Sequence, residues 1–205
     1  MNNFARNTEA AEFKQAPKTY EYRVWNSSVA LTHQELEASF GQGRQETRTD
    51  VYLPPIQNYL SKFRGQSRLE LKERLDKIDG IEIWKRSVSS GFPVSELDLK
   101  QFQPCVSELT LSAETFREAE IALAYFRERL DLFPIKKNRT LYEIEIRGKI
   151  AAEIELTTIT VNDKKHQTLA IECSDHQSAL NLISELDLRR EENISYASWI
   201  KKQSG

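Results

Sequence analysis

Apolar and polar residues alternate along most of the chain, and this period of two predicts β-strands. The segment SRLELKERL at 67–75 shows the pattern clearly. Its leucines, Leu69, Leu71 and Leu75, contribute to one face, whereas its charged residues share the other face. The same alternation predicts eight strands, at 18–25, 46–53, 58–65, 67–75, 80–88, 134–148, 149–161 and 165–173.

A period near 3.6 residues interrupts the strands and predicts amphipathic helices. The first helical segment is the most clearly punctuated, because Thr32 is a good N-cap, Glu35 is its capping-box partner and Gly41 ends the pattern. In the second segment, Ser112 provides the cap. The helical segments are expected at 31–41, 112–133, 174–188 and 193–203.

The order of these elements indicates the fold class. Strands are followed by helices and then by more strands, without the regular strand–helix alternation of a parallel sheet. Turn signals at Gly65-Gln66, Asp79-Gly80 and Asn162-Asp163 predict hairpins between neighbouring strands. We therefore expect one α+β domain at 18–205, built on a mostly antiparallel sheet or barrel, with a flexible lead-in at 1–17.

Composition narrows the functional classes. The chain has 205 residues and a formal net charge of -2, which argues against a polycation that coats nucleic acid and against an acidic disordered tail. Its two cysteines have no metal-binding or disulfide spacing, so reduced thiols are expected. No segment has the length of a membrane span or the apolar core of a signal peptide. We expect a soluble cytoplasmic protein that has no membrane partner.

Charged residues dominate the polar faces of the predicted strands, where a plain solvent face would carry as much Thr, Ser and Gln. If the sheet closes, helices cover its apolar outside and the charges face inward. An open sheet with one wet face gives the same alternation, and any one charge can be a solvated ion pair. The charged set is Glu21, Arg23, Arg48, Asp50, Lys62, Arg64, Arg68, Glu70, Lys72, Arg74, Glu82, Arg86, Lys137, Arg139, Glu143, Glu145, Arg147, Glu153, Glu155 and Glu172, of which Glu143, Glu145 and Arg147 are interpreted as structural.

An inward face of this kind suggests a ligand. Buried ions are costly unless they are paired, hydrated or bound to a partner. Lysine and arginine neutralise phosphate oxygens, and clustered glutamates offer the hard oxygen ligands that Mg²⁺ or Mn²⁺ prefers. A polyanion with a divalent cation would satisfy both sets.

Short motifs in a fixed order strengthen this interpretation, and from about residue 18 to 200 the chain resembles the CYTH family, also called triphosphate tunnel metalloenzymes. The resemblance implies an eight-stranded antiparallel tunnel with helices outside and metal-dependent hydrolysis of triphosphates. Three positions depart from the family pattern: Thr19 and Ala170 replace glutamates and Arg23 replaces a lysine. The motifs are TYEYR (19–23), DVY (50–52), LSKFR (60–64), LELK (69–72), KKNR (136–139), EIEL (153–156), LAIEC (169–173) and SYASWI (195–200).

The resemblance also implies roles for individual residues. Glu21, Lys72 and Glu155 would be catalytic. The metal, Mg²⁺ or Mn²⁺, would be held by Glu21, Glu155 and Glu172, with Glu153 as a substitute or supporting acid. The phosphates would be held by Lys62, Arg64, Lys72, Lys137 and Arg139, with Arg23 and Arg74 further out.

Alternative functions remain open at this point. The substrate would be a small molecule that carries a triphosphate, and an RNA 5′-triphosphate end or a cyclase reaction is compatible with the same motifs. The missing glutamates favour a second class, a tunnel protein that has lost catalysis and binds polyphosphate or nucleotide or serves as a protein-interaction subunit. The sequence sets no expectation for the oligomeric state.

Overall fold

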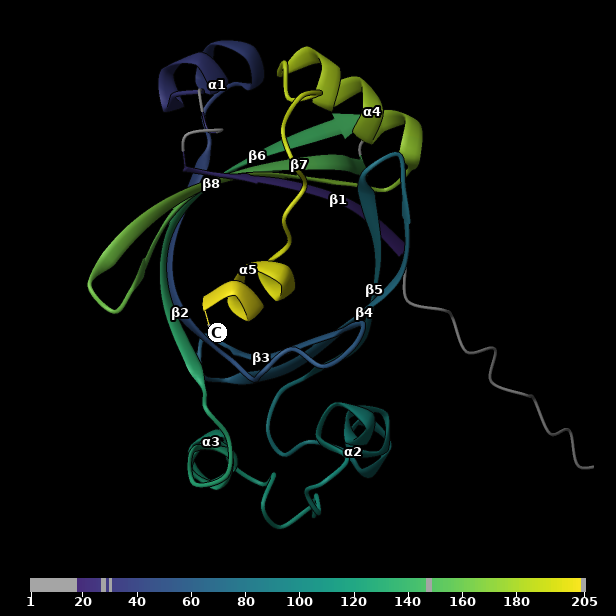
Figure 1. Cartoon of the computed structure of the whole chain (residues 1–205), viewed down its shortest axis with the longest axis vertical. Helices are drawn as coiled ribbons and strands as arrows, with labels where there is room; N and C mark the ends of the chain where they lie inside the picture. The colour runs from purple at the N-terminus through teal and green to yellow at the C-terminus, as the bar shows by residue number, and fades with distance from the viewer. Residues whose placement is uncertain (1–17, 27–28, 30, 147–148, 204–205) are drawn as a thin grey trace, which may run out of the picture.

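The described part of the chain folds around a closed barrel of eight antiparallel strands (Figure 1). The computed structural model describes residues 18–26, 29, 31–146 and 149–203, and the predicted lead-in at 1–17 lies outside them. Around the barrel the strands follow the order β1-β5-β4-β3-β2-β6-β7-β8. The expected α+β fold with an eight-stranded barrel is thus confirmed. The strands are β1 Lys18–Trp25, β2 Arg44–Tyr52, β3 Tyr59–Arg64, β4 Arg68–Ile78, β5 Ile81–Ser90, β6 Phe133–Ile146, β7 Lys149–Val161 and β8 Lys164–Cys173.

Tight turns join several neighbouring strands where the sequence predicts them. Both central residues of each turn have positive φ, which is the conformation of a type I′ hairpin and suits Gly, Asn and Asp. Such turns follow the right-handed twist of the strands and so fix their register. The φ angles are 56° and 58° at Gly65-Gln66, 51° and 80° at Asp79-Gly80, and 48° and 61° at Asn162-Asp163.

The helices begin with the capping residues that the sequence offers, although one is shorter than expected. Thr32 and Glu35 form the predicted capping box. The helix expected at 112–133 is wrong at both ends: Ser112 caps only a turn, and extended backbone at Glu118 interrupts the pattern before the helix begins. The helical elements are α1 His33–Phe40, α2 Glu96–Phe102, the 3-10 helix η2 Gln103–Val106, α3 Ala119–Arg127, α4 His176–Glu185 and α5 Tyr196–Gln203.

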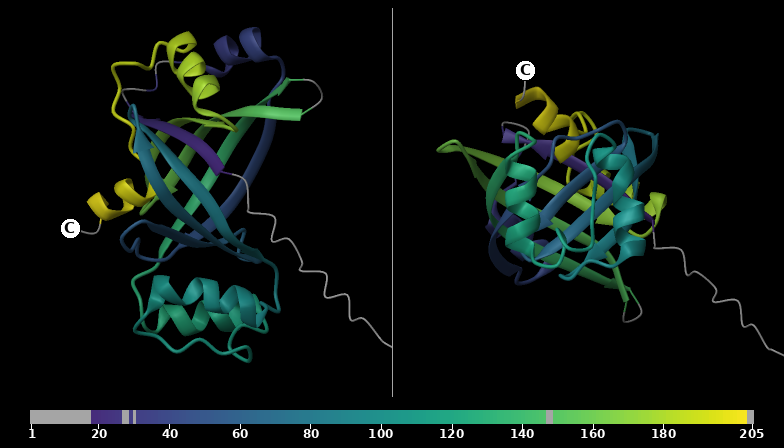
Figure 2. Two further views of the ribbon diagram at one scale, coloured as in Figure 1. Left: turned by 90° about the vertical axis from the view of Figure 1, so that its right-hand side faces the viewer. Right: turned by 90° about the horizontal axis from the view of Figure 1, so that it is seen from below.

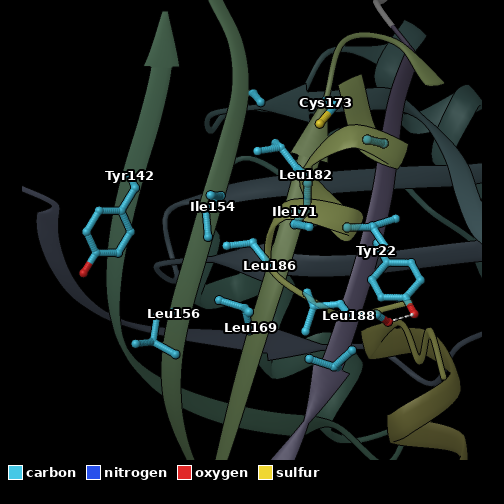
Figure 3. Packing of buried hydrophobic residues seen from close by; sticks show 14 of the residues in the cluster. Tyr22, Tyr142, Ile154, Leu156, Leu169, Ile171, Cys173, Leu182, Leu186 and Leu188 are labelled. Atoms are coloured by element: carbon cyan, nitrogen blue, oxygen red, sulfur yellow. Dashed lines mark hydrogen bonds between the residues drawn. The ribbon is translucent and has the colours of Figure 1, made fainter. Parts of the chain in front are cut away.

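Two hydrophobic clusters cover the outside of the barrel. In the first, α1 and α4 pack on the outer face of β1, β6, β7 and β8, where Ile154, Ile171 and Leu182 meet (Figure 3). In the second, α2, η2 and α3 pack on β2 to β5 and bury Phe63 and Phe126 (Figure 2). Because side chains alternate across a strand, this apolar outer cover leaves the polar residues facing the lumen.

A third hydrophobic cluster lies at one mouth of the barrel, where α5 covers the opening (Figures 1 and 2). Trp199 of α5 stacks on Trp25, with ring centroids 4.7 Å apart. Tyr196 stacks on Tyr52 at 5.5 Å. These aromatic contacts bring the C-terminal helix into direct contact with side chains of the barrel's inner face. Below, the mouth that α5 covers is called the covered end.

Irregular pairing between β4 and β5 moves Leu75 away from the buried face on which the alternation predicts it. Register shifts occur between Leu71 and Lys72 and between Arg74 and Asp76. Leu75 is the extra residue at the second shift and has 40% of its surface exposed, whereas Leu69 and Leu71 are buried under the helices. A bulge interrupts the period of two, so Leu75 does not share the face of the other leucines.

Candidate functional site

The barrel encloses a cavity of about 500 Å³, and charged side chains line most of it. Ten of the eleven residues that the sequence predicts for the site line this cavity. Arg74 is the exception, and its guanidinium donates to Glu82 at 3.0 Å and to Asn58 at 3.1 Å. The residues brought together are Glu21, Arg23, Lys62, Arg64, Lys72, Lys137, Arg139, Glu153, Glu155 and Glu172.

The most deeply buried charges surround Asp50, which has no exposed surface. Its carboxylate accepts from Arg48 Nε at 2.9 Å and from Lys62 Nζ at 3.1 Å, and Lys137 Nζ lies 3.3 Å away. The backbone N–H of Gly65 also donates to it. Burial raises the pKa of Asp50, but the three cations outweigh burial and hold that pKa well below its usual range. Below, the Asp50 group means Asp50 with Arg48, Lys62 and Lys137.

Positive charge is in surplus within the Asp50 group. Burial lowers the pKa of Lys62, and the attraction of Asp50 and Glu70 does not restore it. Burial and the neighbouring Lys62 together hold the pKa of Lys137 well below its usual range. Burial disfavours the charged forms of both lysines, and an added anion would stabilise those charged forms. Electrostatics here therefore favour an anionic ligand.

A chain of ion pairs continues from this group across β2, β6 and β7. Glu155 lies between two guanidinium groups, 3.1 Å from Arg23 and 2.7 Å from Arg139. Arg139 also contacts Glu46 at 2.6 Å, and Arg48 contacts Glu46 at 2.6 Å. Burial raises the pKa of Glu46, but hydrogen bonds from Arg139 and Arg48 lower it to about 2. In this arrangement Glu155 orients arginines.

The carboxylate row, defined as Glu21, Glu172 and Glu153, occupies cross-strand neighbouring positions on β1, β8 and β7. Lys72 Nζ lies 2.5 Å from Glu21 and 3.4 Å from Glu172. Burial and then the charge of Glu21 raise the pKa of Glu172. Burial, followed by Glu155 and Glu172, raises the pKa of Glu153. Unlike the Asp50 group, this row has negative charge in surplus.

The row offers oxygen ligands to a divalent cation, although the set is reduced. Among residues 18–26, 29, 31–146 and 149–203, no three acidic, histidine or cysteine side chains are already arranged to hold one ion. Thr19 and Ala170 line the same cavity and supply no carboxylate. Burial first, and then the neighbouring carboxylates, raise the pKa values of Glu153 and Glu172, and a hard cation would offset both effects. Glu155 is already paired with two arginines, so the row fits Mg²⁺ or Mn²⁺ better than Glu155 does.

Several contributors to the site lie outside the predicted set. Glu46 and Asp50 organise the cationic side chains, and Tyr52 accepts a hydrogen bond from Lys137 at 2.7 Å. Tyr196 reaches the cavity from α5. Strand alternation already placed Asp50 on the charged face, so its position was predictable from the sequence. The sequence placed Tyr196 in the SYASWI motif but gave it no role in the site, because its contacts depend on where α5 docks.

An eight-stranded antiparallel barrel closed around a charged lumen defines a tunnel-type barrel protein. A similar solved structure is the candidate adenylyl cyclase HpAC1 from Hippeastrum, which is described as having a dominant triphosphatase activity. The two chains are 12% identical, the alignment covers 91% of this chain and 96% of that one, and the TM-score is 0.51. This likeness shows that the two chains share a fold.

Two further solved structures align over similar lengths. A candidate adenylate cyclase from Bacillus halodurans is 11% identical, with 91% of this chain and 98% of that chain covered and a TM-score of 0.41. The Pct1 RNA triphosphatase of S. pombe, solved with the Spt5 CTD, is 12% identical, with 93% and 82% covered and a TM-score of 0.34. No family model and no curated protein matches the chain. No described helix is both long and apolar enough to cross a bilayer.

Proposed function

We propose that the tunnel binds the triphosphate group of a small molecule and, with a divalent cation, hydrolyses its terminal phosphoanhydride bond. The observation that carries the proposal is the surplus of positive charge in the Asp50 group, where Lys62 and Lys137 both have lowered pKa values. A triphosphate supplies several negative oxygens, which would replace unfavourable lysine–lysine and lysine–arginine contacts with charge-assisted hydrogen bonds. The motif resemblance to the CYTH family and the fold shared with HpAC1 support the same substrate class.

The carboxylate row and the basic residues would divide the work. Glu21, Glu172 and Glu153 would hold Mg²⁺ or Mn²⁺, which neutralises phosphate oxygens and activates water when bound. Lys62 and Lys137 would hold phosphoryl oxygens deep in the tunnel. Arg64 and Lys72 would bind the phosphates nearer the carboxylate row, and Arg23 and Arg139, which share Glu155, would bind the phosphates farther from it. Because phosphoryl transfer depends mainly on positioning and charge neutralisation, these are the roles that hydrolysis would require.

One structural observation favours a second function, which is binding without turnover. The cavity carries Thr19 and Ala170 at the positions where the family resemblance expects glutamates. Lys72 is already held between two carboxylates of the row, and Glu155 between two arginines. A tunnel with these pairings would retain its anion site even if it holds no metal ion. Experiment decides whether the triphosphate belongs to a small molecule or to an RNA 5′ end.

The test measures phosphate release from inorganic triphosphate, ATP, thiamine triphosphate and 5′-triphosphorylated RNA, each with Mg²⁺ or Mn²⁺. For the preferred substrate, Glu21→Gln should lower turnover by about 100-fold or more, because it removes a carboxylate from the row. Glu73→Gln is the matched control, since Glu73 lies on β4 but does not line the cavity. The control should retain wild-type turnover.

Calorimetric titration with inorganic triphosphate separates the two functions. Turnover that depends on the metal and on Glu21 supports hydrolysis. Heat of binding without turnover of any substrate supports the binding-only function. Absence of both heat and turnover would exclude a triphosphate site in this tunnel.

A further inference from the structure

The hydroxyl of Tyr196 is a buried polar group without a visible partner. Tyr196 begins α5 and has only 6% of its surface exposed, yet it lines the cavity of the barrel. Within the described part of the chain, its hydroxyl oxygen makes no hydrogen bond. Buried hydroxyls are normally paired, so such an atom at a cavity wall points to a partner that enters the cavity.

The surroundings of Tyr196 are strongly cationic. The Arg23 guanidinium lies 4.4 Å from the centre of its ring, and Lys137 Nζ lies 3.9 Å from that centre. Burial raises the pKa of Tyr196, so its hydroxyl keeps its proton at neutral pH and can donate a hydrogen bond. A neutral donor among cations is suited to an anionic acceptor.

A second donor in the same cavity also lacks a partner. The terminal nitrogens of Arg139 donate to Glu155 and Glu46, but its Nε is buried without a hydrogen bond to any described residue. Arg139 shares Glu155 with Arg23, the guanidinium that lies against the Tyr196 ring. Two unpaired donors from different elements, α5 and β6, are therefore linked through Arg23 and Glu155, and both residues line the cavity.

We propose that the Tyr196 hydroxyl and Arg139 Nε form an anion subsite near the covered end of the tunnel, and that this subsite takes the phosphoryl group of a triphosphate that lies farthest from the carboxylate row. The inference rests on the proposed function and adds to it a binding site for one end of the triphosphate. Helix α5 then both covers the mouth and supplies a ligand-binding group. The phosphoryl oxygens accept from both donors, while the rest of the triphosphate extends toward the carboxylate row.

The test compares Tyr196→Phe with wild type by calorimetric titration with inorganic triphosphate and by urea unfolding of the ligand-free protein. The substitution removes the hydroxyl and keeps the ring that stacks on Tyr52. We expect the dissociation constant to rise by about tenfold or more, because a hydrogen bond to a charged acceptor is lost. Ligand-free stability should stay the same or increase, since an unpaired buried hydroxyl is removed.

Tyr142→Phe provides the matched control. The Tyr142 hydroxyl is paired with His33 at 3.2 Å and belongs to the outer hydrophobic cluster, away from the lumen (Figure 3). Its loss should lower ligand-free stability slightly and leave the affinity for triphosphate unchanged. Each variant thus removes one tyrosine hydroxyl, from the lumen side of the barrel in Tyr196→Phe and from the outer side in Tyr142→Phe.

Three outcomes would overturn the inference. Equal affinity of Tyr196→Phe and wild type would mean that the hydroxyl binds only water. Equal losses of ligand-free stability and affinity would assign Tyr196 a purely structural role. If wild type itself gives no heat with triphosphate, the proposed function fails first, and the subsite fails with it; the wild-type titration distinguishes this case from the other two.

Discussion

The Asp50 group lies on β2, β3 and β6 and the carboxylate row on β1, β7 and β8, and the two regions have opposite electrostatics. Asp50 has no exposed surface and is surrounded by three cations, which lower its pKa despite burial. In the row, the Glu172 side chain is 35% exposed, and burial and a neighbouring carboxylate raise its pKa. The Asp50 group has an excess of positive charge and would be stabilised by an anion. The carboxylate row has an excess of negative charge and would be stabilised by a cation.

The difference shows that cross-strand register, more than residue type, decides what a charged position can do. Glu21 faces Glu172, and Glu172 faces Glu153, because the register of β1, β8 and β7 aligns them. Asp50 instead meets lysines from β3 and β6. Acidic residues with the same alternation therefore serve as the centre of a cation cluster in one place and as candidate metal ligands in another.

The largest expected effect follows from removing the anion at the centre of the Asp50 group. Asp50→Asn keeps the size of the side chain and leaves the buried cations without their shared carboxylate. We expect a loss of about 3 to 5 kcal/mol in the free energy of unfolding, because uncompensated buried charge is costly. Urea unfolding at pH 7 measures the loss.

Glu153→Gln, in the carboxylate row, is the comparison for that experiment. Glu153 has no ion-pair partner among the described residues, so its replacement should change the free energy of unfolding by less than about 1 kcal/mol. Similar losses in the two variants would mean that the two regions do not differ as the geometry indicates.

A smaller effect on stability and a larger one on binding are expected for Lys137→Met. Asp50 keeps Arg48 and Lys62 when Lys137 is removed. Because a desolvated lysine is replaced by an apolar chain, the free energy of unfolding should change by less than about 1 kcal/mol. Affinity for inorganic triphosphate should fall by about tenfold, since a cationic partner of the phosphates is lost. Unchanged affinity in calorimetric titration would remove Lys137 from the anion site.

Much of this comparison was accessible from the sequence. Alternation placed Glu21, Lys62 and Lys72 on one face, and turn residues such as Asp79 and Gly80 fixed where strands reverse. These features are local, because they depend on the side-chain period and on the φ angles that particular residues tolerate. The closed barrel then brings ten of the eleven predicted site residues to one cavity.

Features that depend on distant contacts were not accessible in this way. A register shift exposes Leu75, and Arg74 pairs with Glu82 and Asn58 without lining the cavity. The helix α2 was missed, although Ser95 caps it and its pattern is too short to stand out. Tyr196 enters the cavity only because α5 docks on Trp25 at one mouth. Local periodicity carries no information about such docking.

The smallest expected effect is a difference in pH dependence between the two regions. Burial, Glu155 and Glu172 raise the pKa of Glu153, so the folded state binds its proton more tightly than the unfolded state. The stability linked to Glu153 is therefore complete below a pH of about 4 and is lost as pH rises through the raised pKa. Asp50 has the opposite sign: its lowered pKa adds stability above about pH 4, and this stability is lost as pH falls.

Glu153→Gln should therefore be slightly more stable than wild type at pH 7, by less than about 1 kcal/mol, and the gain should vanish near pH 4. Asp50→Asn should be much less stable than wild type at pH 7, and its deficit should shrink as the pH drops below 4. Urea unfolding of the three proteins between pH 3 and pH 7 measures both trends. A gain for Glu153→Gln that is constant across this range would show that its carboxyl titrates alike in the folded and unfolded states. The row would then lack the excess of negative charge that makes it a candidate for binding a cation.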